Sequence, residues 1–339
     1  MSSYFRNSIL ATIVYYDIFD YPLTPSEVHG NLINPARIMM IKSGIGEIDV
    51  NDINEELKKL ATSQVIGEKN GFYFLGGRDE LYETRTKTNQ VADQKWKKFF
   101  KFTKFLALTP YLRGVFASGS LALGNTDEQS DFDVLIIARS GRLYTCRLFL
   151  WLITSLLGVR RKKHEKSAPD KFCFNHYITN DSLKLTHESL FNAQTYANLK
   201  PAMIGQEMVD EFYDSNLWLN NYLYNFQPQK DFARKNIKPW KLLLFVAGAF
   251  EWFFNSRLGD VFEKFVKTIQ QKKIKNNPVT YESGGRIVFT DYELEFHPHS
   301  FEKFVIEKYN QTLNKLGVIS YVKETDSGLL APHQAHPLS

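Results

Sequence analysis

The sequence has few of the features that mark secreted or membrane-spanning chains. Its two cysteines, Cys146 and Cys173, are too few for a disulfide scaffold or a structural zinc site. The first ten residues lack the basic-then-apolar layout of a signal peptide. The apolar runs 143–158 and 242–254 are short and each contains a charged residue, so both predict buried helices rather than membrane spans. These absences favour a globular protein of the reducing cytoplasm.

The net charge of the chain is also small, but the charge is unevenly distributed along it. The chain of 339 residues has 42 Lys/Arg and 37 Asp/Glu, a formal charge of +5, which is unlike a polybasic arm. Residues 1–86 have eight basic and twelve acidic side chains, a net charge of −4, so residues 87–339 carry +9. We therefore expect a polyanionic partner to bind the second part of the chain.

Residues 1–86 have a helical pattern that ends in a hairpin. The apolar segment 8–19, the capping box with proline at 24–27 and the amphipathic segment 52–64 predict three helices. Two β-prone runs then flank Asn-Gly at 70–71, the strongest signal for a two-residue hairpin. This order predicts an N-terminal winged helix-turn-helix domain.

The charge of this domain argues against DNA reading. Most nonspecific affinity for DNA comes from Lys and Arg that neutralise phosphates. The expected recognition helix, 52–64, has three acids and two lysines on a domain of net charge −4. We therefore do not expect sequence-specific DNA binding, and a scaffold or protein-contact role suits this charge better.

The remaining chain is predicted to hold two further regions and a tail. A basic amphipathic helix at 87–108 links the first domain to an α/β domain over 87–185, and its basic face is either solvated or contacts phosphates. Residues 186–322 are predicted to be a helical C-terminal region, and 323–339 a tail without fixed structure. The overall expectation is an α+β protein whose central domain has a mixed sheet.

One segment of the central domain carries chemistry. Gly119 and Ser120 follow a strand, and a Gly-Ser turn there presents backbone N–H groups and a hydroxyl to phosphate oxygens. Asp131 and Asp133 precede an apolar run, and residues two apart on a strand project from the same face. Two such carboxylates are best accommodated by a shared hard divalent cation. A phosphate cradle beside paired carboxylates predicts metal-assisted phosphoryl or nucleotidyl transfer.

The segment VFASGSLALGNTDEQSDFDVLII resembles the signature of the nucleotidyltransferase superfamily, which has the polymerase-beta-like fold of minimal nucleotidyltransferases and kanamycin nucleotidyltransferase. The matching positions are Gly119, Ser120, Gly124, Ser130, Asp131 and Asp133. The resemblance of fold covers about residues 85–180. It implies that the glycine and serine positions bind a nucleoside triphosphate, with ATP the expected one, and that Asp131 and Asp133 bind Mg²⁺ or Mn²⁺. A small-molecule, protein or RNA acceptor would then attack the α-phosphate and release pyrophosphate.

The sequence departs from this family in one respect. Family enzymes usually have a third carboxylate on a later strand, but the matching strand, 172–179, offers Asn175 and His176. Asn175 can ligate a metal through its amide oxygen but cannot act as a base, whereas His176 can accept a proton. Alternation places these two side chains on opposite faces, so at most one can face the metals. Other acids that could supply the missing charge are Asp127, Asp170, Asp181 and Glu188.

Three functional hypotheses follow from these observations. The first is an enzyme that transfers a nucleoside monophosphate from a triphosphate to an acceptor. The second is a regulator of the same fold that binds nucleotide or RNA but has lost transfer with its third acid. The third is a ligand-sensing winged-helix DNA-binding protein. Basic residues at 139, 142, 147, 160–163 and 166 are candidate phosphate contacts, with a solvated loop or structural ion pairs as the alternative.

Overall fold

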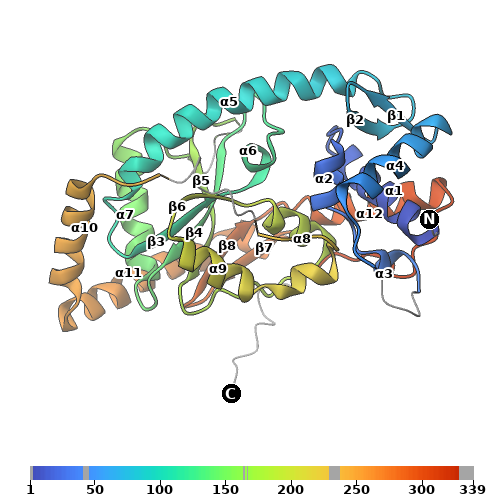
Figure 1. The fold of residues 1–339 in the computed structure, drawn as a ribbon. Helices are drawn as coiled ribbons and strands as arrows, with labels where there is room; N and C mark the ends of the chain where they lie inside the picture. The colour runs from blue at the N-terminus through green and yellow to red at the C-terminus, as the bar shows by residue number, and fades with distance from the viewer. Residues whose placement is uncertain (1–2, 41–45, 163–164, 166, 229–236, 328–339) are drawn as a thin grey trace.

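The computed structural model describes residues 3–40, 46–162, 165, 167–228 and 237–327. Its first part has helices followed by a two-stranded hairpin, at the right of Figure 1. The predicted capping box is confirmed, because the Thr24 hydroxyl accepts from Glu27 N–H and the Glu27 carboxylate from Thr24 N–H. Asn70 and Gly71 have φ values of 52° and 81°, as a tight hairpin turn requires. The elements are α1 (Ser3–Asp17), α2 (Pro25–Gly30), α3 (Pro35–Ile38), α4 (Val50–Thr62), β1 (Ile66–Lys69) and β2 (Phe72–Leu75).

A long helix, α5 (Leu81–Leu106), joins this part to a mixed sheet of six strands (Figure 1). The spatial order of the strands is β6-β3-β4-β5-β8-β7. The β4–β5 pair is parallel and the other pairs are antiparallel. The strands are β3 (Leu112–Ala117), β4 (Phe132–Ala138), β5 (Phe172–Thr179), β6 (Lys200–Ile204), β7 (Arg286–Phe289) and β8 (Glu293–His297). The chain is therefore an α+β protein with a mixed sheet, as predicted.

Two apolar cores cover the two faces of this sheet. One core joins Val115, Val134 and Ile136 to side chains of α5 and of α7 (Leu143–Leu156). The other core joins Phe116, Leu135 and Ile137 to side chains of α8 (Leu190–Ala197) and α9 (Gln206–Asp214). Successive residues of β3 and β4 thus alternate between the two cores, which fixes the register of both strands.

The prediction of a helical region over 186–322 is wrong in part. Strands β6, β7 and β8 all come from this region and complete the sheet. The segment of β6 contains Pro201, and β6 lies at an edge of the sheet, where a residue without an N–H is tolerated. The helices of the region beyond α9 are α10 (Lys241–Phe254), α11 (Arg257–Lys275) and α12 (Glu302–Lys315).

The end of the described chain packs against its beginning. Helix α12 contributes Val305, Ile306 and Tyr309 to the core around α1. Glu324, which is 3% exposed, accepts from the Arg37 guanidinium at 2.6 Å. Residues 323–327 are therefore fixed by contacts, although a tail without fixed structure was expected from 323. The remainder of that predicted tail, 328–339, lies outside the described residues.

A cluster of buried ionic groups ties β7 and β8 to α12. The Arg286 guanidinium donates to both oxygens of Glu295, at 2.6 and 2.8 Å, and lies 3.3 Å from Glu302. Glu295 and Glu302 are fully buried. Burial alone would raise the pKa of Glu295, but the charges of His176 and Arg286 outweigh it and lower this pKa to about 2. The cluster therefore holds ionised partners inside the protein.

The two apolar runs that were predicted to be buried helices differ in their surroundings. Helix α7 buries Leu143, Cys146 and Leu150 against the sheet. Helix α10 buries only Leu243 and Ala247, so the prediction of a buried helix over 242–254 is wrong. Across the described residues, no helix is long and apolar enough to cross a membrane.

Candidate functional site

The sequence motif lies at one edge of the sheet, where β3 ends and β4 and β5 begin. Because β3 and β4 are antiparallel, the end of β3 meets the start of β4, and Ala117 is paired with Val134. Because β4 and β5 are parallel, their starts lie together, and Asp133 is paired with Cys173. The topology thus brings the Gly-Ser turn, the two aspartates and the first residues of β5 to one place.

The glycines of the motif have conformations that other residues rarely adopt. Gly119, the first residue of α6 (Gly119–Leu123), has φ +62°. A Cβ atom at this position would lie 2.5 Å from the Asp133 carboxylate oxygen Oδ2. Gly124 ends the helix with φ +81°. Glycine at 119 therefore lets the backbone of the turn approach the carboxylate closely.

Asp131 and Asp133 converge with Cys173. One oxygen of each carboxylate and the Cys173 sulfur all lie within 4.8 Å of one another, so these three residues could hold a metal ion. Asn175 Nδ2 donates to Asp133 Oδ1 at 2.8 Å. Arg161 Nη1 lies 2.5 Å from Asp131 Oδ2. The two carboxylates thus share one site but have different partners.

The protonation of this site depends on its burial. Burial, and then the negative charge of Asp131, raise the pKa of Asp133 from 3.8 to about 7, against the lowering effects of Cys173, Arg161 and Asn175. Burial and the same two carboxylates raise the pKa of the Cys173 thiol as well, so it stays protonated at neutral pH. A cation bound near Asp133 would stabilise the ionised form of this carboxylate.

A hard divalent cation fits this donor set better than a soft metal does. Two carboxylate oxygens from positions two residues apart suit Mg²⁺ or Mn²⁺, which prefer oxygen ligands. The protonated thiol of Cys173 is not a ligand for such ions. Asn175 could contribute its amide oxygen only if it gave up its present orientation, in which the nitrogen faces Asp133. Asp131 and Asp133 are thus the residues that could hold the ion.

The other predicted site residues are two serines of the motif and His176. Ser120 follows Gly119 in α6, and Gly119 is the residue that lies beside Asp133. Ser130 donates its hydroxyl to Asp127 Oδ1 at 2.7 Å and accepts from Asp127 N–H, so it stabilises the loop before β4. His176 lies on the other face of β5, 3.0 Å from Glu293, as alternation predicted.

None of the four acids considered as a third carboxylate is grouped with the pair in the described structure. Asp127 bonds to Ser130, as described above. Asp170 forms ion pairs with Lys95 and Lys98 on α5. Asp181 accepts from Ser140, beyond the opposite end of β5, and Glu188 is exposed. The residues that β5 brings to the pair are therefore Cys173 and Asn175.

Sequence reasoning did not foresee that Arg161 pairs with Asp131. The pairing arises because Arg160 forms a bridge with Phe172 at the start of β5, and Arg161 N–H donates to the Phe172 carbonyl. This contact between a loop and a strand has no local sequence signal. Of the other basic candidates, Arg142 pairs with Asp260, whereas Lys163 and Lys166 lie outside the described residues.

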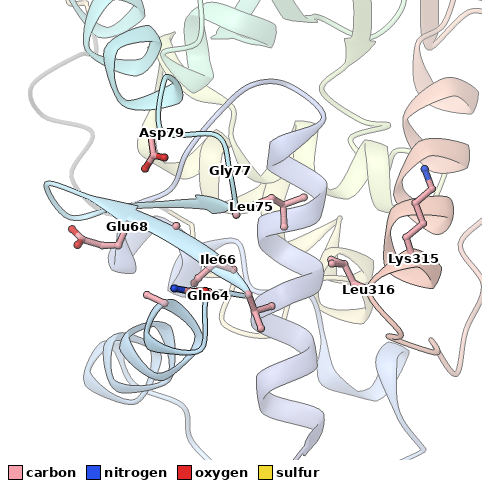
Figure 2. A pocket seen from close by; sticks show the side chains of 12 residues that line it. Gln64, Ile66, Glu68, Leu75, Gly77, Asp79, Lys315 and Leu316 are labelled. Carbon is pink, nitrogen blue, oxygen red and sulfur yellow. The ribbon is translucent and has the colours of Figure 1, made fainter.

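Two cavities lie near the N-terminal part of the chain. A cleft of about 940 Å³ lies between α2, α5 and α6, and its walls include Gly124 of the motif together with Glu27, Arg85 and Lys200. The carboxylate pair does not line this cleft. A cavity of about 1110 Å³ lies between the β1–β2 hairpin and the end of α12, where Figure 2 shows Lys315 and Leu316 opposite the hairpin. That cavity is remote from the motif in the chain and in the fold.

Comparison with known proteins identifies no relative. No family model, curated protein or solved structure matches the chain.

Proposed function

We propose that this protein is a nucleotidyltransferase that uses Mg²⁺ or Mn²⁺ to transfer a nucleoside monophosphate, with ATP the expected donor, to an acceptor. The observation that carries the proposal is the convergence of Asp131 and Asp133 beside Gly119. The carboxylates would hold the cation, and the turn at Gly119 and Ser120 would hold the triphosphate at its side. When bound, the cation would supply charge stabilisation to the phosphate oxygens.

The residues around the pair would prepare it for the cation and the triphosphate. Asp133 would lose its proton when the cation binds, since a positive charge lowers the pKa that burial has raised. Asn175 would keep Asp133 in position through its amide. Arg161 is 38% exposed and could turn from Asp131 to the phosphates once the cation neutralises that carboxylate.

A second candidate function is a regulator that binds nucleotide or RNA without transferring it. Two features favour it: β5 presents Asn175 where family enzymes usually have a carboxylate, and Arg161 already satisfies Asp131. In either case the N-terminal part, which we propose is a winged helix, would serve as a scaffold or protein-contact unit. A DNA-reading role is not favoured by its net charge of −4.

The two functions are separated by a transfer assay. The protein is incubated with Mg²⁺ or Mn²⁺, each α-labelled nucleoside triphosphate, and pools of small-molecule, RNA and protein acceptors. An enzyme transfers label and releases pyrophosphate, and Asp131→Asn and Asp133→Asn abolish both. Asp181→Asn, beyond the other end of β5, is the matched control and should leave both unchanged. Nucleotide binding without transfer would support the regulator, and no binding at all would contradict both functions.

A further inference from the structure

Helix α10 exposes large apolar side chains that the described part of the chain leaves uncovered. Leu242 is 70% exposed, Phe245 is 74% exposed and Trp252 is 81% exposed. They recur at i, i+3 and i+10, a spacing that places them on one side of a helix. In Figure 1, α10 lies at the far end of the molecule from the N-terminal part, with α11 beside it.

The neighbouring helix α11 continues this exposure. Leu258 is 67% exposed, Phe265 is 61% exposed and Ile269 is 51% exposed. These three residues also share one helical side, and the buried residues Glu263 and Ile274 lie on the opposite side. We call these six residues of α10 and α11 the apolar surface. Large exposed apolar side chains gathered on two neighbouring helices mark an interaction site.

Polar contacts fix both helices to the body of the protein, so their exposure does not come from a detached segment. Glu251 of α10 accepts from Tyr111 N–H at 2.5 Å and from the Arg113 guanidinium at 2.8 Å. Glu263 of α11 accepts from the backbone N–H groups of Tyr144 and Thr145 at the start of α7. The apolar surface is therefore held in place by the fold.

The charges around the apolar surface are predominantly positive. Each acidic side chain of α10 and α11 already has a partner. Glu251 pairs with Arg113, Asp260 pairs with Arg142, and Glu263 accepts hydrogen bonds from backbone N–H groups. By contrast, several basic side chains of the same helices form no ion pair with a described carboxylate. They are Lys241, Arg257, Lys264, Lys272 and Lys273.

This combination selects one occupant among those that could cover the surface. A second copy docked through a twofold axis would bring the same basic residues together, which repel each other. A nucleic acid would neutralise the lysines but leave the apolar side chains in water. An anionic bilayer offers hydrocarbon for the apolar side chains and phosphate for the lysines.

We propose that the apolar surface docks this protein on an anionic phospholipid bilayer. Helix α10 has 14 residues, too few to span the hydrocarbon core, so it lies in the plane of the interface. Trp252 then sits at the headgroup level, where tryptophan is enriched. The proposal does not depend on the proposed function, because no residue of the carboxylate pair takes part in it.

Vesicle flotation with the full chain tests the proposal. We expect binding to vesicles of phosphatidylcholine with about 30% phosphatidylglycerol, little binding to phosphatidylcholine alone, and release in about 0.5 M NaCl. The double variant Phe245→Ser, Trp252→Ser should bind at least tenfold more weakly. Ile319→Ser, which removes an apolar side chain that is 85% exposed after α12, is the matched control and should bind as the wild type does.

A second variant tests the electrostatic part and avoids any loss of folding. Lys272→Glu, Lys273→Glu changes only exposed side chains and should weaken binding to the anionic vesicles at least tenfold. Equal binding to both vesicle types, or no binding to either, would overturn the proposal. A dimer in solution that Phe245→Ser, Trp252→Ser converts to a monomer, with no vesicle binding, would assign the surface to a second copy and also overturn it.

Discussion

Replacement of Asp133 by asparagine should change how stability depends on pH when no divalent cation is present. Burial and the neighbouring charge of Asp131 raise the pKa of Asp133 from 3.8 to about 7. The folded chain therefore retains a proton that the unfolded chain releases. The free energy of unfolding of the wild type should therefore fall as the pH rises from about 4 to about 7. Above that range Asp133 is ionised in the folded protein too, and the loss is complete. Asparagine does not ionise, so the variant lacks this loss.

The size of the effect follows from the shift. About three pKa units correspond to about 4 kcal/mol of differential stability, of which about 3 kcal/mol develops between about pH 5 and about pH 8. The stability of Asp133→Asn relative to the wild type should therefore be about 3 kcal/mol greater at the higher pH. Comparison of the two pH values cancels the other consequences of the substitution. Mg²⁺ at the higher pH should narrow the gap, because it stabilises the ionised pair in the wild type.

Urea denaturation followed by circular dichroism measures this difference. Asp181→Asn is the matched control, since the Ser140 hydroxyl lowers the pKa of Asp181 and neither the folded nor the unfolded form titrates in this range. A wild-type and Asp133→Asn difference that stays within about 1 kcal/mol between the two pH values would refute the reasoning. It would mean that the carboxyl is ionised with little penalty and has no need of a cation.

Three further changes have defined outcomes. Gly119→Ala should lower the free energy of unfolding by about 1–3 kcal/mol more than Gly141→Ala does. Gly141 is the control because its φ of +69° is similar, but a Cβ there would meet open space. Equal losses in urea melts would show that the close approach of Gly119 to Asp133 imposes no cost on a Cβ. Glu295→Gln removes the nearer of the two buried carboxylates that pair with Arg286 and should lower the free energy of unfolding by about 3 kcal/mol. A loss below about 1 kcal/mol in urea melts would contradict the ionised cluster. Arg161→Met should raise the affinity for Mn²⁺ about fivefold in the absence of nucleotide, because the ion pair of Arg161 with Asp131, about 1 kcal/mol, no longer competes with the metal. Unchanged affinity, measured by electron paramagnetic resonance, would place the ion elsewhere.

Local signals in the sequence predicted the features that depend on few residues. The hairpin at Asn70 and Gly71 and the cap at Thr24 form within a few positions of the chain, so their residues specify them directly. The approach of Gly119 to Asp133 was also predictable, because β3 and β4 are consecutive strands of the chain and consecutive strands usually lie side by side in a sheet.

Features that depend on distant segments could not be predicted in the same way. The segment around Pro201 becomes an edge strand only because β3 lies beside it, and the partner of Asp131 comes from the loop before β5. The apolar composition of α10 predicts burial but does not identify what covers it. The partners of Asp133 at the start of β5 follow from strand register, which a single sequence specifies only weakly.

The central claim is that Asp131 and Asp133 together bind a divalent cation that carries a triphosphate. Electron paramagnetic resonance of Mn²⁺ tests it most directly, because bound Mn²⁺ loses the signal of the free ion. We predict that ATP increases Mn²⁺ binding to the wild type and that Asp131→Asn and Asp133→Asn abolish this increase while Asp181→Asn retains it. Equal Mn²⁺ binding by all four proteins, with or without ATP, would contradict the claim.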